Sequence, residues 1–312
     1  MGYLITAPLA LALPATVSGC SARPSVPRLD VAAGESGGMY FEFATLLSQA
    51  LVSERIAEQS SVLQTEASAQ NLHLLAENQS LLSLALADAV DQYRSESNDA
   101  EPLALGRVYQ NYFHALVRAD SSIHQVSDLA GSRLGTGAPG SGTWITGQRI
   151  LQMAGLKAEG KIPKETKLGY TDGLAALEAA EVDALFLFGG MPVGAISDLA
   201  ARIELRLLDL SMVLSGLRLR YPGLYDRVVI PAGTYPGVGE VQSIGVGNLL
   251  MAQAGLPDQV AGEVVRLLVD QAHELIPQNS AGIQYLTAQS LISTAGQPLH
   301  PGAREAYRQL HG

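Results

Sequence analysis

The sequence predicts an α/β protein with two lobes, and three observations lead to this prediction. The chain has 312 residues, more than a single hydrophobic core usually organises. Short apolar runs alternate with amphipathic helical patterns, as in the βαβ units that build mainly parallel sheets. Three glycine-rich stretches, at the expected junctions between strands and helices, are spread over both halves of the chain, which favours a cleft between two lobes.

The individual elements follow from the spacing of apolar residues. In the helix expected over residues 37–54, for example, Phe43, Leu47 and Leu51 recur at helical spacing. Apolar runs predict strands at residues 28–33, 61–65, 81–86, 112–117, 132–135, 166–170, 183–188, 205–209 and 242–249. Further helices are expected at residues 67–77, 142–153, 173–180, 193–201 and 257–275, and from residue 301 onward. The polar, acidic stretch 91–101 is interpreted as a surface loop.

Composition and charge exclude several classes of function. Hydrophobic residues make up 47% of the chain and charged residues 16%, which is typical of a well-packed globular protein. Thirty acidic and twenty basic residues give a net charge of −10, which repels phosphate backbones, so no nucleic-acid partner is expected. A local site of backbone N–H groups can still bind an anion, because salt screens distant charges within about 10 Å.

The N-terminus has the pattern of a secretory signal. Residues 4–17 form an uncharged apolar run that is too short and too interrupted by proline to span a membrane. The run ends in Val17-Ser18-Gly19-Cys20, which resembles a lipobox. We therefore expect residues 1–20 to form a lipoprotein signal peptide, with lipid attached to Cys20. The alternative is a buried free cysteine, and the absence of Lys or Arg before Cys20 leaves the true start of the chain open.

The glycine-rich stretches at residues 34–38, 135–143 and 189–192 are candidate ligand-binding turns. Glycines let the backbone approach a ligand, and the helix that follows presents unpaired N–H groups and the positive end of its dipole. In the central stretch, Ser141-Gly142-Thr143 opens a helix, where hydroxyl groups either cap the helix or bind an anion. Ordinary turn chemistry is the alternative for any one of the three stretches.

Enzyme motifs receive little support. Gly135, Gly137 and Gly140 fit the dinucleotide fingerprint G-x-G-x-x-G, but the preceding strand is weak and only Asp172 could serve as the acidic residue that follows it. No lysine completes a P-loop, and the six histidines lack metal-ligand spacing. We therefore expect no enzyme, metal or cofactor. A dinucleotide-dependent enzyme is kept as the main alternative, and a sensory or scaffold protein as a third.

From about Leu29 onward, the chain resembles the TAXI solute-binding proteins of TRAP (tripartite ATP-independent periplasmic) transporters. Seven short pieces occur in the order found in that family, which makes the match specific. The pieces lie at residues 36–40 (SGGMY), 117–120 with 128–131 (VRAD and DLAG), 137–143 (GAPGSGT), 182–184 (VDA), 189–192 (GGMP), 230–236 (IPAGTYP) and 299–303 (LHPGA).

The resemblance implies a type II periplasmic-binding-protein fold, with two α/β lobes and a ligand cleft between them. Residues 28–115 and 241–312 would form lobe 1, and residues 116–240 would form lobe 2. The implied protein is extracytoplasmic (periplasmic) and delivers a small acidic metabolite or amino acid to the membrane subunits of a TRAP transporter. Glutamate, glutamine and 2-oxoglutarate are the ligands expected from the family.

The resemblance also implies which residues bind the ligand. The residues expected from lobe 1 are Ser36, Gly37, Gly38, Tyr40 and Asn71, and those from lobe 2 are Ser141, Gly142, Thr143, Gly189 and Gly190. One departure concerns Glu35, which lies in Ala33-Gly34-Glu35-Ser36 where the family usually has a Thr-Gly-Ser-Thr-like turn. Its negative charge predicts a selectivity moved away from dicarboxylates or toward ligands that carry an amine.

Overall fold

The structure is a computed structural model, and it describes residues 25–36, 38–66, 68–78, 81–97, 102–277 and 285–311. The expected signal peptide, Cys20 and Gly37 lie outside these described residues. No helix among them is both long enough and apolar enough to cross a membrane.

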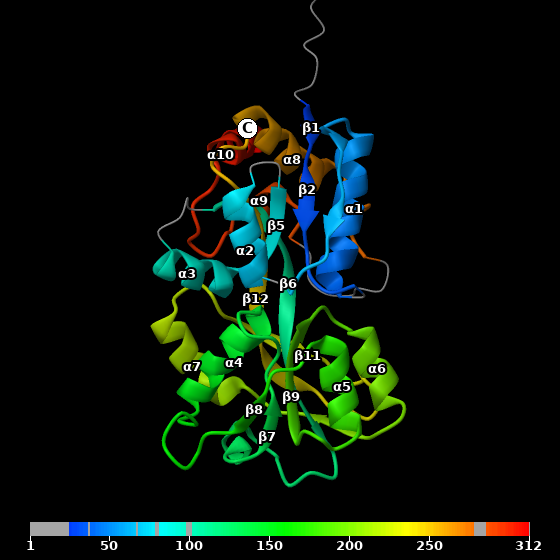
Figure 1. Cartoon of the computed structure of the whole chain (residues 1–312), viewed down its shortest axis with the longest axis vertical. Coiled ribbons are helices and arrows are strands. Elements are labelled where there is room, and N and C mark those ends of the chain that lie inside the picture. The colour runs from blue at the N-terminus through cyan, green and yellow to red at the C-terminus, as the bar shows by residue number, and fades with distance from the viewer. Residues whose placement is uncertain are drawn as a thin grey trace, which may run out of the picture.

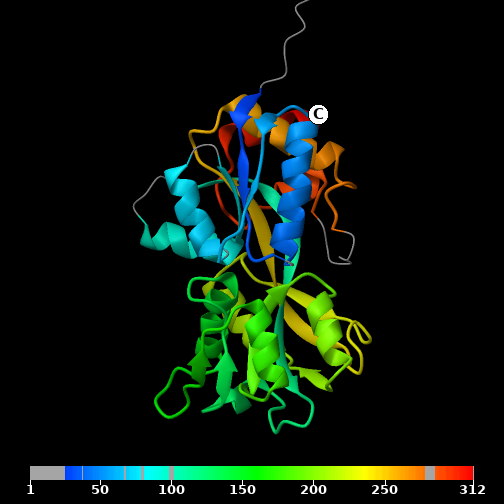
Figure 2. The same ribbon diagram turned by 45° about the vertical axis from the view of Figure 1, so that its right-hand side comes forward.

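Two lobes are joined by two long strands that run through both of them (Figure 1). Strands β6 (Leu103–Arg118) and β12 (Val241–Ala252) pair antiparallel over most of their length. They occupy the middle of one sheet with the order β4-β2-β5-β12-β6-β9-β7-β8. Figure 2 shows the same two strands bridging the narrow region between the lobes. The expected α/β fold with two lobes is confirmed.

Lobe 1 contains the parallel trio β4-β2-β5 and the helices around it. Its strands are β1 (Val26–Arg28), β2 (Asp30–Ala32), β3 (Ala57–Gln59), β4 (Val62–Leu63) and β5 (Leu81–Leu86). Its helices are α1 (Met39–Ser53), α2 (Ser68–Glu77), α3 (Ala87–Glu96), α8 (Asp258–Asp270), α9 (Ala288–Leu291) and α10 (Pro301–Leu310). The C-terminal helices thus return to the lobe in which the described chain begins (Figure 1).

Lobe 2 contains a second parallel trio, β9-β7-β8. Its strands are β7 (Arg133–Gly135), β8 (Lys164–Thr166), β9 (Ala184–Gly189), β10 (Leu205–Leu207) and β11 (Asp226–Ile230). Its helices are η1 (Val126–Leu129), α4 (Gly142–Met153), α5 (Tyr170–Glu178), α6 (Gly194–Ala200) and α7 (Ser211–Arg220). The boundaries expected between the lobes stay a prediction, because β6 and β12 belong to both lobes.

The expectation of a mainly parallel sheet was wrong in the middle of the molecule. Strand β12 is antiparallel to both β5 and β6, and β6 is antiparallel to β9. The parallel pairing is restricted to the trio within each lobe, where helices cross over between neighbouring strands. No crossover helix joins β6 or β12 directly to the strand beside it, so these two strands can pair antiparallel.

Residues 91–96, the first part of the stretch expected to be a loop, instead continue helix α3, which spans Ala87–Glu96. Ala87, Val90 and Tyr93 are buried at a spacing of three residues, so one helix face packs on the core, whereas Ser95 and Glu96 near the end of the helix are exposed. The strand expected at residues 166–170 was also misplaced, because β8 ends at Thr166 and α5 begins at Tyr170. Helix α7 and strand β11 were not expected.

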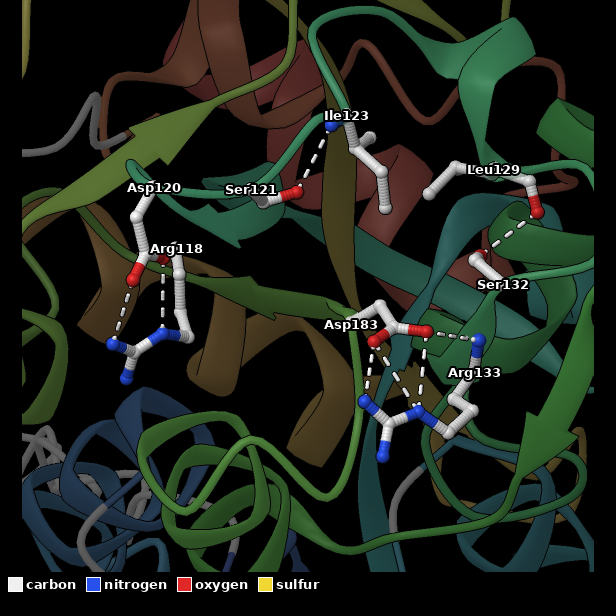
Figure 3. Close-up of polar contacts among 8 residues, drawn as sticks. All are labelled: Arg118, Asp120, Ser121, Ile123, Leu129, Ser132, Arg133 and Asp183. Atoms are coloured by element: carbon white, nitrogen blue, oxygen red, sulfur yellow. Dashed lines mark hydrogen bonds and ion pairs between the residues drawn. The ribbon is translucent and has the colours of Figure 1, made fainter.

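Several of the family-like pieces are part of the scaffold at the far end of lobe 2 (Figure 3). The Asp183 carboxylate accepts a hydrogen bond from the backbone N–H of Arg133 at 2.8 Å and pairs with its guanidinium group. Arg118 pairs with Asp120, and the Ser132 hydroxyl donates to the carbonyl of Leu129 at 2.8 Å. These contacts stabilise turns of lobe 2, and none of the residues drawn in Figure 3 lines the cavity between the lobes.

Candidate functional site

A cavity of about 420 Å³ lies between the two lobes. Lobe 1 contributes residues from the turn after β2, the first turn of α1 and the start of α2. Lobe 2 contributes the turn before α4, the turn before α5 and the segment from β9 to α6. The volume suits a small metabolite, because ligand sites typically enclose about 300–1,000 Å³.

Most of the residues predicted from sequence come together around this cavity. The predicted residues in its lining are Ser36, Gly38, Tyr40, Ser141, Gly142, Thr143, Gly189 and Gly190. Asn71 is not in the lining. Its amide accepts a hydrogen bond from Thr65 at 2.5 Å and donates to the carbonyls of Ala33 and Leu84. The Asn71 side chain therefore ties α2 to β2 and β5 and has no hydrogen-bonding group left for a ligand.

The central glycine turn points the N-terminus of α4 at the cavity. Gly137 and Gly140 have φ angles of +79° and +77°, which residues with side chains rarely adopt. Ser141 is the N-cap of α4, and its hydroxyl accepts from the backbone N–H of Trp144 at 3.2 Å. First-turn N–H groups have no partner within a helix, so Gly142 and Thr143 present donors suited to an anion.

The Thr143 hydroxyl serves both the fold and the cavity. It accepts a hydrogen bond from the backbone N–H of Phe188 at 3.1 Å, which ties α4 to β9. Its own proton remains available for donation into the cavity that Thr143 lines. Ser141 also accepts a backbone hydrogen bond, from Trp144, and likewise keeps its own proton, so both hydroxyls of the Ser-Gly-Thr piece can donate to a ligand.

On the side of lobe 1, Tyr40 and Ser68 form part of the wall. Their hydroxyl oxygens lie 3.3 Å apart, and Ser68 also accepts from the backbone N–H of Leu86 at 3.1 Å. Burial raises the pKa of the Tyr40 phenol well above its ordinary value, so the group stays neutral and can donate a hydrogen bond.

The lobes touch directly beside the cavity. A Cβ atom added to Gly142 would lie only 2.1 Å from Leu86 Cδ1, and one added to Gly140 would lie 3.0 Å from Ala69 Cβ. Leu86 and Ala69 belong to lobe 1, whereas the two glycines belong to lobe 2. A side chain at residue 142 would displace the Leu86 side chain, so the backbone of lobe 2 lies directly against lobe 1 and the cleft is closed.

A chain of buried hydrogen bonds positions the segment between β9 and α6. The Tyr235 hydroxyl accepts from the backbone N–H of Val193 at 3.0 Å and donates to His114 Nε2 at 2.8 Å. His114 Nδ1 lies 2.9 Å from the carbonyl of Tyr112 and must donate to it, which fixes the neutral tautomer. Burial lowers the pKa of His114 to about 4. This histidine was not predicted from the sequence, although Tyr235 lies within one of the family-like pieces.

A second contact between the lobes lies around Asp88 on α3. The Asp88 carboxylate is fully buried and accepts hydrogen bonds from Thr146 of α4 and, at 3.0 Å, from Tyr225. Arg149 of α4 donates to the Tyr225 hydroxyl at 3.0 Å and pairs with Asp91. Burial raises the pKa of Asp88, and the nearby Arg149 opposes this shift. The sequence had assigned no role to these residues.

The charge of the cavity lining is entirely acidic. Glu35, Glu42 and Glu66 contribute to the lining, whereas none of the described residues that line it is Lys, Arg or His. Among the described residues, no group of three or more His, Cys, Asp or Glu side chains is arranged to hold a metal ion. Only Glu35 had been singled out from the sequence.

A family model described as NMT1-like family matches residues 31–309, which is most of the chain. The chain belongs to the NMT1-like family. The match begins in β2 and ends within α10, so this NMT1-like unit comprises both lobes and the crossing strands.

Solved structures share the fold of this NMT1-like chain at low sequence identity. XAC2383 from Xanthomonas citri bound to ATP has a TM-score of 0.53 at 16% identity, over 92% of this chain and 95% of that one. The periplasmic binding protein BugD has a TM-score of 0.53 at 13% identity, over 92% and 94%. MatC from Rhodopseudomonas palustris with bound malate has a TM-score of 0.54 at 11% identity, over 91% and 97%. The chain therefore has the two-lobed fold of periplasmic binding proteins.

Proposed function

We propose that this protein is the extracytoplasmic solute-binding component of a TRAP transporter of the TAXI type. It captures a small carboxylate between its lobes and delivers it to the membrane subunits. The observation that carries the proposal is the closed cavity of about 420 Å³, which residues of both lobes line. The two lobes are connected by the crossing strands β6 and β12. Such a site encloses its ligand when the lobes close and releases it when they open.

The α4 N-terminus is the proposed carboxylate site. It offers backbone N–H groups and the Thr143 hydroxyl proton, and its first turn contains no acidic residue. MatC, which shares the fold, was solved with malate, a carboxylate. The expected glutamate, glutamine and 2-oxoglutarate are the first carboxylates to test.

A binding protein is favoured over a dinucleotide-dependent enzyme. The glycines at 137 and 140 are explained by the turn that aims α4 at the cavity. Asp172, the acidic residue that the dinucleotide fingerprint would need, lies inside α5 rather than at the end of a strand. Among the described residues that line the cavity, no histidine is present to serve as a general base for a serine or threonine nucleophile.

We extend the proposal to the location of the protein. Secretion with a signal peptide over residues 1–20 and lipid attachment to Cys20 would hold the chain at the membrane surface, beside the transporter subunits. Anchoring of this kind keeps the released ligand close to its membrane partner.

Mass spectrometry of the ligand released from purified, denatured protein tests the proposal. We expect one small carboxylate, bound in a 1:1 ratio by calorimetry and recovered chemically unchanged after incubation with the protein. A nicotinamide or flavin dinucleotide in its place, or turnover of the bound molecule, would overturn the proposal in favour of the enzyme.

A further inference from the structure

The acidic residues of the cavity all come from lobe 1 and gather toward its mouth. Glu35 and Glu66 line both the cavity and a second, more open hollow that adjoins it, whereas Glu42 lies in the first turn of α1. None of the three forms an ion pair with a described residue. A dicarboxylate enclosed here would face three negative charges without any basic side chain in the lining.

Glu35 reaches across the cleft to lobe 2. A Cβ atom added to Gly169 would lie 2.9 Å from the Glu35 Oε1 atom, so this carboxylate lies directly against the backbone at the start of α5. The contact holds a negative charge at the boundary between the cavity and the outer hollow.

Asn111 independently indicates that the ligand carries a hydrogen-bond donor. It lies on β6, lines the cavity and is only 4% exposed. Its Oδ1 atom accepts no hydrogen bond from any described residue. This oxygen is enclosed by the protein, and a buried acceptor without a partner is unfavourable. A rotation of the Asn111 side chain that brings the oxygen to a hydrogen-bond donor in the cavity would therefore be stabilising.

The two lobes thus offer opposite charge to a ligand. Glu42 in the first turn of α1, Asp172 in that of α5 and Glu66 just before α2 each offset the positive end of a helix dipole, whereas the first turns of α4 and α6 in lobe 2 contain no acidic residue. Lobe 2 therefore presents an uncompensated helix N-terminus, and lobe 1 presents carboxylates. Between them the lining is largely apolar, with Met39, Leu187 and Phe188 among its residues.

From this arrangement we infer that the ligand is a zwitterion with an apolar body, such as an apolar amino acid, and not a dicarboxylate. Its ammonium group faces Glu35 and Asn111, and its carboxylate binds at the α4 N-terminus. This inference rests on the proposed function and narrows its substrate class. A zwitterionic ligand also explains why the cleft closes, because each end of the ligand is attracted by a different lobe.

Calorimetric titration of the full-length, ligand-stripped protein tests the inference with five probes. L-Leucine and L-phenylalanine carry both charged groups, 4-methylpentanoate is leucine without its amine, and L-glutamate and 2-oxoglutarate are dicarboxylates. We expect at least one of the two apolar amino acids to bind. We expect 4-methylpentanoate and 2-oxoglutarate, which lack the amine, to bind at least about tenfold more weakly, as loss of a charge-assisted hydrogen bond requires. Glutamate keeps the amine, but it should also bind at least about tenfold more weakly, because its second carboxylate would face the acidic lining.

A pair of variants distinguishes the effect of a charge in the cavity on ligand affinity from the effect of the protein's net charge. Glu35→Gln should weaken binding of the amino acid about tenfold or more and leave the affinity for 4-methylpentanoate unchanged. Glu58→Gln removes the same charge from an exposed position on β3 and should change neither affinity. If 4-methylpentanoate binds as tightly as leucine, or if only the dicarboxylates bind, the zwitterion inference is wrong while the proposed function stands. If none of the five binds and the purified protein releases no carboxylate, both are wrong.

Discussion

Replacing Gly142 with alanine should prevent the cleft from closing as it does in this structure. The new Cβ atom would lie 2.1 Å from Leu86 Cδ1, whereas carbon atoms in contact are separated by about 3.6 Å. The lobes would therefore have to separate by roughly 1.5 Å at this point, since Leu86 is buried and packed in the core. Overpacking of this size costs about 1–3 kcal/mol, and here the cost falls on the closed state alone.

Because only the closed state is affected, we expect ligand affinity to fall about 5- to 150-fold. The unfolding temperature of the ligand-free protein should stay the same or rise, since alanine favours a helix more than glycine does by up to about 1 kcal/mol. Calorimetric titration with the ligand that the native protein retains, together with thermal melts, measures both effects. Small-angle scattering should show the liganded variant to be more open than the wild type.

Gly262→Ala is the matched control, because it also adds a methyl group to a helix. Its Cβ atom would meet nothing closer than the carbonyl oxygen of Gly302 at 3.4 Å, within lobe 1. This variant should keep the affinity of the wild type. If Gly142→Ala also binds as tightly as the wild type, the ligand is bound in a form whose lobes do not meet at Leu86, and the reasoning from closure is refuted.

Three further predictions test other parts of the structure. Thr143→Ala should weaken ligand binding by about 1–3 kcal/mol in calorimetry, whereas Thr143→Ser, which keeps the hydroxyl, should bind the ligand nearly as tightly as the wild type. An equal loss of affinity in both variants would exclude a role for the hydroxyl. The pKa of His114 is lowered from 6.5 to about 4 in the folded state. The contribution of this group to the free energy of unfolding is therefore fully present above pH 6.5 and is lost as the pH falls toward 4. Urea unfolding should therefore show about 2 kcal/mol less stability at pH 4.5 than at pH 7 from this group, and His114→Gln should lack this part of the pH dependence. Mass spectrometry of native protein extracted from membranes should find a lipid-modified Cys20 at the N-terminus; an unmodified thiol would contradict the lipoprotein prediction.

The sequence predicted those features that depend on local patterns. Helix α4 was expected over residues 142–153 and has those bounds, because its apolar spacing and its Ser-Gly-Thr start are both local signals. The second part of helix α3 was predicted as a loop because its residues 91–96 are polar except for Tyr93, which extends the narrow buried face formed by Ala87 and Val90. Strand β6 was predicted in its second half only. Its first half contains Gly106 and Arg107, which interrupt the apolar run that signals a buried strand.

The candidate site was predictable where glycine marks a close approach of the backbone, and not where distant segments meet. Gly142 and Gly189 lie in glycine-rich stretches that a reader of the sequence can recognise, and both line the cavity. Asn111 and Glu42 have no such signal, because their place in the lining depends on how β6 crosses between the lobes and how α1 faces the cleft. His114 lies in an apolar strand, and nothing in the sequence indicates its partner 121 residues away.

The two contacts between the lobes differ in kind, and the difference bears on how the cleft opens. Where Gly142 meets Leu86, the contact is apolar, so separation exposes little more than a leucine side chain and a bare backbone. Where α3 meets α4 and Tyr225, separation would expose the Asp88 carboxylate to water, which relieves its desolvation but breaks its hydrogen bonds to Thr146 and Tyr225. Because these two effects oppose each other, the Asp88 contact contributes less to closure than its hydrogen bonds alone would. A ligand that bridges a lobe 1 carboxylate and the α4 N-terminus would then supply the differential binding energy that decides between the open and closed forms.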